Sequence, residues 1–411
     1  MANDQIVVIG GGLAGGRLAL AYRDAGGEAD VTILGAEPDP PYNRPPLTKG
    51  FLRGELERDA TLVRPAEDYE EAVVDLRLGA EVEAIHPDEH EVELAGGERV
   101  PYGTLVVATG ARPRALPVPG ADKVGVHTYR TLADAETVRA AAEDAHAAIV
   151  IGGSFIGAES AASLRLRGLD VTLVEAGSAL MPQLGAPELS AELLELYRAE
   201  GVDVRLEAQV EELTGNGKLL TGARLADGTT IEGYLAIAGI GVVPNVELAE
   251  RAGATVDNGI VVDERFLSSL PDVYAIGDVA RFPEPVSGRL RRIEHWTNSE
   301  AHGAHLGRQL AGSTDPYDAF PVFFTQLFDR KLQVLGDVEP AVECILRGSL
   351  ADGRLIGFHL TAERQLVGAV VHGHAADVAQ ELQGLIRERP VVDDPTRLLD
   401  ESLRPADAVV A

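Results

Sequence analysis

Cysteine is almost absent from this chain, which has only Cys344 among 411 residues. An internal disulfide is therefore excluded, and so is a redox-active cysteine pair of the kind that thiol–disulfide enzymes use. A single cysteine fits a reducing compartment, and the first predicted strand begins so near Met1 that no signal peptide is expected. The longest apolar run, residues 234–243, is too short for a membrane span. We expect a cytoplasmic protein that does not enter the membrane.

Basic residues are scarce as well. The chain has 36 Lys and Arg against 65 Asp and Glu, a net charge of −29, and its only lysines are Lys49, Lys123, Lys218 and Lys331. Such a charge argues against sequence-independent binding of nucleic acid or of anionic membranes. Hydrophobic residues make up 45%, which is enough for a packed core, and the length predicts two or three domains.

The N-terminal segment has the pattern of a dinucleotide-binding module. Four apolar residues predict a buried strand, the motif Gly10-x-Gly12-x-x-Gly15 follows directly, and residues 13–24 predict an amphipathic helix. These glycines permit a tight turn, close approach of the backbone to a pyrophosphate, and close packing of helix on strand. The turn residues predicted to bind are Gly10, Gly12, Leu13, Ala14 and Gly15.

An acidic residue about 20 positions beyond such glycines accepts hydrogen bonds from the adenosine ribose. Glu37 fits this position, although it lies slightly beyond the end of the predicted strand 31–34. The alternative is a solvated loop carboxylate.

The same pattern recurs after the strand 147–151. Its turn residues are Gly152, Gly153, Ser154, Phe155, Ile156 and Gly157, and Ser154 departs from the strict motif by replacing the middle glycine. Glu175 ends the next strand at the ribose position, where its charge would repel a 2′-phosphate, so NADH is favoured over NADPH. Two such modules in one chain imply two dinucleotides.

Histidine pairs do not predict a metal site. His302 and His305, like His372 and His374, lack a third ligand or a carboxylate cluster nearby in the sequence. Thr297-x-x-Glu300 has the form of a capping box and predicts a helix from there to about residue 310.

The proline-rich segment 40–49 predicts a rigid, non-helical stretch. From Tyr42 to Lys49 it resembles the Tyr-x-Arg-Pro-Pro-Leu-Ser/Thr-Lys stretch of the oxygenase-coupled ferredoxin and rubredoxin reductases. These are flavoproteins of the glutathione-reductase fold, related to apoptosis-inducing factor. The resemblance implies that Arg44 contacts FAD, that Lys49 lies beside the isoalloxazine ring, and that Glu159 pairs with Lys49 as the second catalytic residue. From the residues alone, Glu159 is equally an ordinary acid at a helix N-terminus.

The resemblance covers essentially the whole chain and implies an α/β fold with an inserted module. It divides the chain into an FAD-binding domain (1–112 and 243–318), an NAD-binding domain (113–242) and a small α+β C-terminal domain (319–411). It places Gly241 near the nicotinamide and assigns to FAD the residues Thr109, Gly110, Arg114, Asp278, Glu294, His295 and Trp296. The family usually has tryptophan where this chain has Phe324, and Asp-Gln where it has Gln326-Leu327.

The implied function is an NADH-dependent flavoprotein reductase that passes electrons through FAD to a ferredoxin or rubredoxin serving an oxygenase or cytochrome P450. Arg289, Arg291 and Arg292 could form a basic docking patch for an acidic partner. One alternative is an NADH oxidase or quinone-type reductase with a small acceptor. Another is a redox-dependent binding protein like apoptosis-inducing factor. The expected oligomeric state is a monomer or a homodimer.

Overall fold

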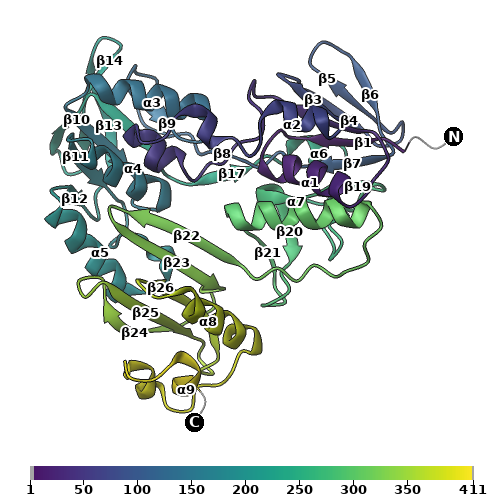
Figure 1. The fold of residues 1–411 in the computed structure, drawn as a ribbon. Coiled ribbons are helices and arrows are strands. Elements are labelled where there is room, and N and C mark those ends of the chain that lie inside the picture. Colours follow the sequence, from purple (N-terminus) through teal and green to yellow (C-terminus); the bar gives the residue numbers. More distant parts are fainter. Residues whose placement is uncertain (1–3, 410–411) are drawn as a thin grey trace. The chain divides into compact units, whose positions relative to one another are not determined.

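The computed structural model describes residues 4–409, which form two compact units (Figure 1). Unit 1 comprises the residues up to Asn43, Arg58–Arg112 and Val242–Ala319, and unit 2 comprises Arg44–Glu57, Pro113–Gly241 and the residues from Phe320 onward. The segment Arg44–Glu57 thus lies in unit 2, whereas the sequence assigned it to the FAD-binding domain. The three-domain division stays a prediction.

Unit 1 is built on a parallel sheet with strand order β19-β7-β1-β2-β3. Its central strand is fully buried, as expected for a run of β-branched residues covered on both faces. The strands are β1 (Ile6–Ile9), β2 (Val31–Gly35), β3 (Val74–Leu78), β7 (Thr104–Val107) and β19 (Val273–Ala275).

Helices α1 (Leu13–Asp24) and α7 (Trp296–Leu310) lie side by side in unit 1 (Figure 1). Glycines one turn apart on α7 allow this approach, because a β-carbon on Gly303 or Gly307 would collide with backbone oxygens of α1. The other elements of this unit are β4 (Val82–His86), β5 (Glu91–Leu94), β6 (Arg99–Pro101), β18 (Ile260–Val261), β20 (Ala280–Pro283), β21 (Leu290–Arg292), α2 (Ala66–Glu71), α6 (Glu247–Arg251), and the short turns η2 (Arg58–Thr61) and η4 (Gly277–Val279). A two-stranded sheet joins β8 (Ala111–Pro113) and β17 (Val242–Pro244).

Unit 2 repeats the parallel arrangement with strand order β12-β11-β10-β16-β9. Residues 210–232 form a separate three-stranded antiparallel sheet. The elements are β9 (Val126–Thr128), β10 (Ala147–Ile151), β11 (Asp170–Val174), β12 (Asp203–Arg205), β13 (Val210–Asn216), β14 (Leu219–Leu225), β15 (Thr230–Glu232), β16 (Leu235–Ala238), α3 (Leu132–Asp144), α4 (Phe155–Leu166), α5 (Pro187–Ala199), η1 (Leu47–Phe51) and η3 (Pro182–Leu184).

The C-terminal part of unit 2 is an antiparallel sheet of order β22-β23-β26-β25-β24, with α8 packed against it (Figure 1). Its strongly buried strands β25 and β26 supply the core of this part. The elements are β22 (Val322–Leu327), β23 (Arg330–Gly336), β24 (Glu343–Ser349), β25 (Arg354–Leu360), β26 (Leu366–His372), α8 (Ala376–Glu388), η5 (Pro395–Leu399) and α9 (Pro405–Val409).

The predicted capping box at the start of α7 is wrong. The helix begins at Trp296 with His295 as its N-cap, so Thr297 already lies in the first turn. The carboxylate of Glu300 instead pairs with Arg17 of α1 at 3.2 Å. Glu300 therefore takes part in a long-range ion pair between two helices, and the N-cap position that the motif predicts for Thr297 belongs to His295.

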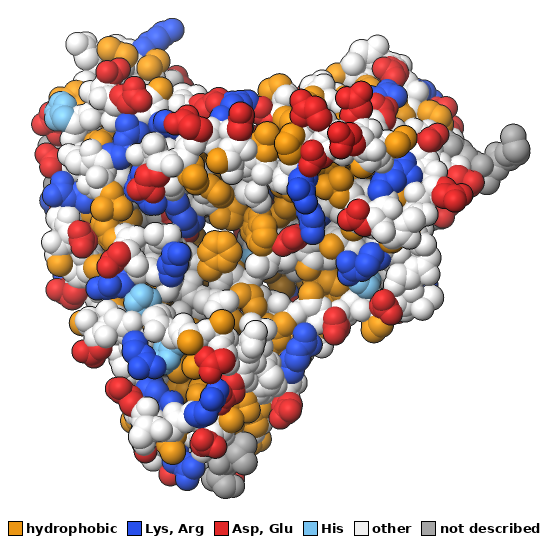
Figure 2. Space-filling view, viewed as in Figure 1, with side chains coloured by type: hydrophobic (Ala, Val, Ile, Leu, Met, Phe, Trp, Pro, Cys, Tyr) orange, Lys and Arg blue, Asp and Glu red, His pale blue; other side chains and the backbone are white. Residues whose placement is uncertain are grey.

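Acidic side chains are spread over the visible face of the molecule, with basic ones among them (Figure 2). No helix within residues 4–409 is long and apolar enough to cross a membrane. Among these same residues, no group of three or more His, Cys, Asp or Glu is arranged to hold a metal ion.

Candidate active site

The first glycine turn of unit 1 has the shape that a dinucleotide pyrophosphate requires. Gly10 has φ +119°, and a β-carbon there would collide with the carbonyl of Ala108. Gly12 is the N-cap of α1 and has no side chain to occupy the first helical N–H groups, and the space beside its Cα is open. Leu13 and Ala14 open the helix, whose N-terminal N–H groups suit an anionic ligand. These residues fit an FAD pyrophosphate.

Other predicted FAD residues of unit 1 are held by hydrogen bonds within that unit. Glu37 accepts a hydrogen bond from the hydroxyl of Tyr42 at 2.6 Å, which holds the carboxylate at the end of β2. Asp278, in η4, accepts one from Ser299 of α7 at 3.0 Å. The indole N–H of Trp296 donates to Asn43 Oδ1 at 2.7 Å.

Thr109 and Gly110 follow strand β7. The Thr109 hydroxyl donates to the carbonyl of Asn245 at 2.7 Å, and the Asn245 amide donates back to the Thr109 carbonyl at 2.8 Å. Gly110 has φ +66°. The turn is therefore tied to the segment that follows β17, an arrangement that no local sequence pattern indicated.

His295, half-buried, is the N-cap of α7, and His302 is buried farther along the same helix. Burial lowers the pKa of His295 to about 4 and that of His302 to about 3, so both rings are neutral at pH 7. His302 Nδ1 accepts a hydrogen bond from the backbone N–H of Gly277 at 3.2 Å, next to Asp278. The sequence pattern argued against metal binding by His302 and did not indicate this structural role.

The predicted basic docking patch does not form as three exposed arginines. The side chain of Arg292 is 10% exposed, pairs with Glu294 and donates to the carbonyl of Asp278 at 3.1 Å. Arg291 is 20% exposed, and only Arg289 lies fully at the surface. Arg291 and Arg292 thus lie against acidic groups of their own unit, and the docking patch itself stays a prediction.

The second glycine turn, in unit 2, closely repeats the first. Gly152 has φ +102°, and a β-carbon there would collide with the carbonyl of Gly239, while Gly157 packs directly on the Gly152 carbonyl. Ser154 is the N-cap of α4 and makes no side-chain cap bond. Its hydroxyl accepts a hydrogen bond from the amide of Gln183 at 3.0 Å, a contact that the sequence did not indicate. Phe155 and Ile156 begin the helix.

Glu175 closes this turn from the end of β11. One carboxylate oxygen accepts the N–H of Gly153 at 2.5 Å, and the other accepts the N–H of Gly177 at 2.6 Å. The Glu175 carboxylate therefore holds both the glycine turn at Gly153 and the loop at Gly177, on either side of the predicted ribose position. Farther along, Gly241 has φ +92°, and its carbonyl accepts the N–H of Arg114 at 2.9 Å, so these two predicted residues lie together.

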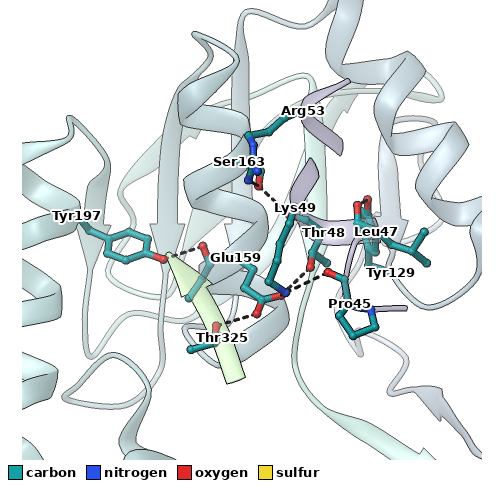
Figure 3. A network of polar contacts seen from close by, with 11 residues as sticks. Pro45, Leu47, Thr48, Lys49, Arg53, Tyr129, Glu159, Ser163, Tyr197 and Thr325 are labelled. Atoms are coloured by element: carbon teal, nitrogen blue, oxygen red, sulfur yellow. Dashed lines mark hydrogen bonds and ion pairs between the residues drawn. The ribbon is translucent and has the colours of Figure 1, made fainter. Parts of the chain in front are cut away.

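Lys49 and Glu159 lie together in unit 2 as a buried ion pair (Figure 3). Lys49 Nζ is 2.5 Å from Glu159 Oε2 and also donates to the carbonyl of Pro45 at 3.1 Å. Lys49 interrupts the turn η1 with non-helical angles (φ −119°, ψ −113°), while Arg44, half-buried, precedes that turn. The structure thus joins two residues 110 positions apart that only the family resemblance paired.

Two hydroxyls complete this network, and the sequence indicated neither. Thr48 donates to Glu159 Oε2 at 2.6 Å, and Thr325 of β22 donates to Glu159 Oε1 at 2.7 Å (Figure 3). Glu159 is 5% exposed and Lys49 9%. A buried pair is tolerated when hydrogen bonds satisfy its remaining lone pairs and protons. Here the two hydroxyls donate to both Glu159 oxygens, and the Pro45 carbonyl accepts from Lys49.

Comparison with known proteins identifies the family. Residues 4–303 match the family model described as pyridine nucleotide-disulphide oxidoreductase. The chain is 38% identical over 412 residues to the 5,5′-dehydrodivanillate O-demethylase ferredoxin reductase subunit of Sphingobium sp. (strain NBRC 103272 / SYK-6), covering 99% of this chain and 97% of that protein. It is 34% identical to putidaredoxin reductase CamA of Pseudomonas putida, covering 100% and 97%.

Solved structures give the same result. The ferredoxin reductase for the CYP199A2 system from Rhodopseudomonas palustris matches with a TM-score of 0.93 and 32% identity over 99% of this chain and 100% of that one. The covalent putidaredoxin reductase–putidaredoxin complex matches with a TM-score of 0.93 and 33% identity, covering 100% and 99%. The predicted α/β fold with Rossmann-like parallel sheets is confirmed. The protein is an oxidoreductase that uses FAD and a nicotinamide nucleotide, and its chain belongs to the pyridine nucleotide-disulphide oxidoreductase family.

Proposed function

We propose that this protein passes electrons from NADH through FAD to a ferredoxin or rubredoxin that serves an oxygenase or a cytochrome P450. The observation that carries the proposal is that relatives matched over nearly the whole chain are reductase components of such systems. The lack of a cysteine pair agrees with it, because the single cysteine lies in β24 and cannot form a redox disulfide within the chain. A cytoplasmic location and a monomeric or homodimeric state stay predictions.

Unit 1 supplies the residues that would hold FAD. The uncapped N-terminus of α1 and the open space at Gly12 receive the pyrophosphate, and Glu37 accepts from the adenosine ribose. Asp278, oriented by Ser299, accepts from the ribityl hydroxyls. Bound FAD would supply the chemistry that converts a hydride from the nicotinamide into single electrons for an iron–sulfur partner.

Unit 2 supplies the nicotinamide nucleotide site. The N-terminus of α4 receives the pyrophosphate, with Ser154 in place of the usual glycine. Glu175 accepts from the ribose hydroxyls and disfavours a 2′-phosphate, which supports a preference for NADH over NADPH.

Lys49 and Glu159 have the proposed catalytic roles. The Lys49 ammonium, held by Glu159 and by a backbone carbonyl, supplies positive charge that favours the negative charge added by flavin reduction. An unpaired cation about 4 Å from the reduced flavin would stabilise its negative charge by about 4 kcal/mol at an effective dielectric constant of about 20. The negative charge of Glu159 offsets part of this stabilisation, so the main effect of Glu159 is to orient the Lys49 ammonium.

The test is NADH-dependent reduction of cytochrome c by the FAD-loaded protein, with and without candidate ferredoxins. We expect stimulation by at least one ferredoxin, since single-electron transfer to cytochrome c then proceeds through the iron–sulfur protein. No stimulation by any ferredoxin or rubredoxin, together with rapid reoxidation of the reduced protein by air, would instead support a reductase of small acceptors. A long-lived reduced complex with a changed oligomeric state would support a redox-dependent binding protein.

A further inference from the structure

We propose that Thr325 is a positioning residue that orients the Lys49–Glu159 pair from the C-terminal sheet. The inference deepens the proposed function and rests on it, because it assigns to the C-terminal sheet a part in setting the charge beside the flavin. Three distant parts of the chain meet at this pair (Figure 3). They are the proline-rich segment, helix α4 and strand β22.

The hydrogen bonds of the two Glu159 oxygens divide unequally. Oε2 receives both the Lys49 ammonium at 2.5 Å and the Thr48 hydroxyl at 2.6 Å. Oε1 receives the Thr325 hydroxyl at 2.7 Å, and Thr325 is 1% exposed. If that hydroxyl is removed, a buried carboxylate oxygen loses its donor, and the carboxylate gains by rotating toward the donors that remain. The Lys49 ammonium would then move with it.

Strand and helix geometry hold the hydroxyl in register. Phe323 and Thr325 lie two residues apart on one face of β22, and Phe155 and Glu159 lie four residues apart on one face of α4. The strand spacing of about 6.8 Å nearly matches the helix spacing of about 6 Å. The rings of Phe155 and Phe323 meet edge to face, with centroids 4.8 Å apart. The aromatic contact and the hydrogen bond therefore fix β22 on α4 at two points.

A purely structural hydroxyl would only stabilise the packing of β22 on α4. Thr325→Val tests this difference, because it keeps the shape of the side chain and removes the donor, whereas Thr325→Ser keeps the donor. The matched control is Thr137→Val on α3, since that exposed hydroxyl donates only to the carbonyl of Ala133 in its own helix.

The small number of lysines makes the pair directly observable. In oxidised, FAD-loaded protein labelled with ¹³C-lysine, four side-chain signals are expected, from Lys49, Lys123, Lys218 and Lys331. Loss of one signal in Lys49→Met assigns the buried lysine. We expect Thr325→Val to shift the Lys49 signal and leave the other three unchanged, while Thr325→Ser and Thr137→Val retain the wild-type spectrum.

Stopped-flow reduction by NADH gives the second measurement. We expect the limiting rate of flavin reduction to fall about tenfold in Thr325→Val, with the Kd for NADH changed less than twofold and the rate restored by Thr325→Ser. If the valine variant does not fold, Thr325→Ala takes its place. An unchanged Lys49 signal and rate, or equal impairment by serine, would overturn the proposal. If NADH does not reduce the flavin of the wild-type protein, the proposed function is overturned instead, whatever the Lys49 signal shows.

Discussion

Replacing Glu175 by glutamine should weaken the discrimination against NADPH. The carboxylate accepts the N–H groups of Gly153 and Gly177 and carries one negative charge at the proposed ribose site. Two unit charges 4 Å apart interact by about 1 kcal/mol in water and by about 4 kcal/mol at an effective dielectric constant of about 20. These limits correspond to about fivefold and about a thousandfold in kcat/KM. Because Glu175 is partly exposed, we expect the lower part of this range.

The assay should not depend on the physiological acceptor. Ferricyanide reduction gives kcat/KM for NADH and for NADPH, and the ratio of the two should fall about five- to fiftyfold in Glu175→Gln. Glutamine has one acceptor oxygen for two N–H groups, so one hydrogen bond worth about 1.5–3 kcal/mol is lost. The Tm should therefore fall by a few degrees, and FAD binding should be unchanged.

Glu195→Gln is the matched control, because the substitution removes the same charge from a side chain on α5 that is 74% exposed. Its cofactor ratio and Tm should match those of the wild type. A ratio that changes less than twofold in Glu175→Gln, with the Tm lowered as expected, would show that the carboxylate organises the loops without selecting the nucleotide.

Three further predictions concern buried groups of the two units. Lys49→Met should lower the free energy of unfolding by about 3–5 kcal/mol because it leaves a buried carboxylate unpaired, and adding Glu159→Gln should recover part of it; equal stability of the single and double variants in chemical denaturation would contradict this. The pKa of His302 is about 3 in the folded protein, against an ordinary value of 6.5. The unfolded chain therefore binds this proton at a higher pH than the folded protein does, and stability is lost as the pH falls below 6.5. From pH 6.5 to 5 this loss is about 2 kcal/mol, and Tm measured against pH should show a shallower decline in His302→Phe. Gly303→Ala should lower the Tm and the FAD content, because its β-carbon collides with the α1 backbone, whereas Gly384→Ala, in open space on α8, should stabilise by about 0.5–1 kcal/mol; a Gly303→Ala protein as stable as the wild type would refute the packing argument.

The parts of the site that local sterics determine were predictable from the sequence. Gly10 and Gly152 stand where a buried strand must turn sharply into a helix, and both have the positive φ that the motif implies. Contacts between distant segments were not predictable. Thr325 donates to a carboxylate 166 positions away, and no local pattern distinguishes it from any other threonine in a strand. The capping box also failed, because α7 already begins at Trp296, before Thr297, and Glu300 pairs with Arg17, far along the chain.

The lone cysteine has a practical consequence for mapping the surface that binds the acceptor. Cys344 is half-buried in β24, and burial raises the pKa of its thiol to about 12, so little reactive thiolate is present near pH 7. Maleimide reagents should therefore modify an introduced cysteine much faster than the native one. Exposed positions such as Leu219 and Leu290 can each be changed to cysteine and labelled singly. A bulky label that blocks reduction of an added ferredoxin would mark the docking face, without any need to replace Cys344 first.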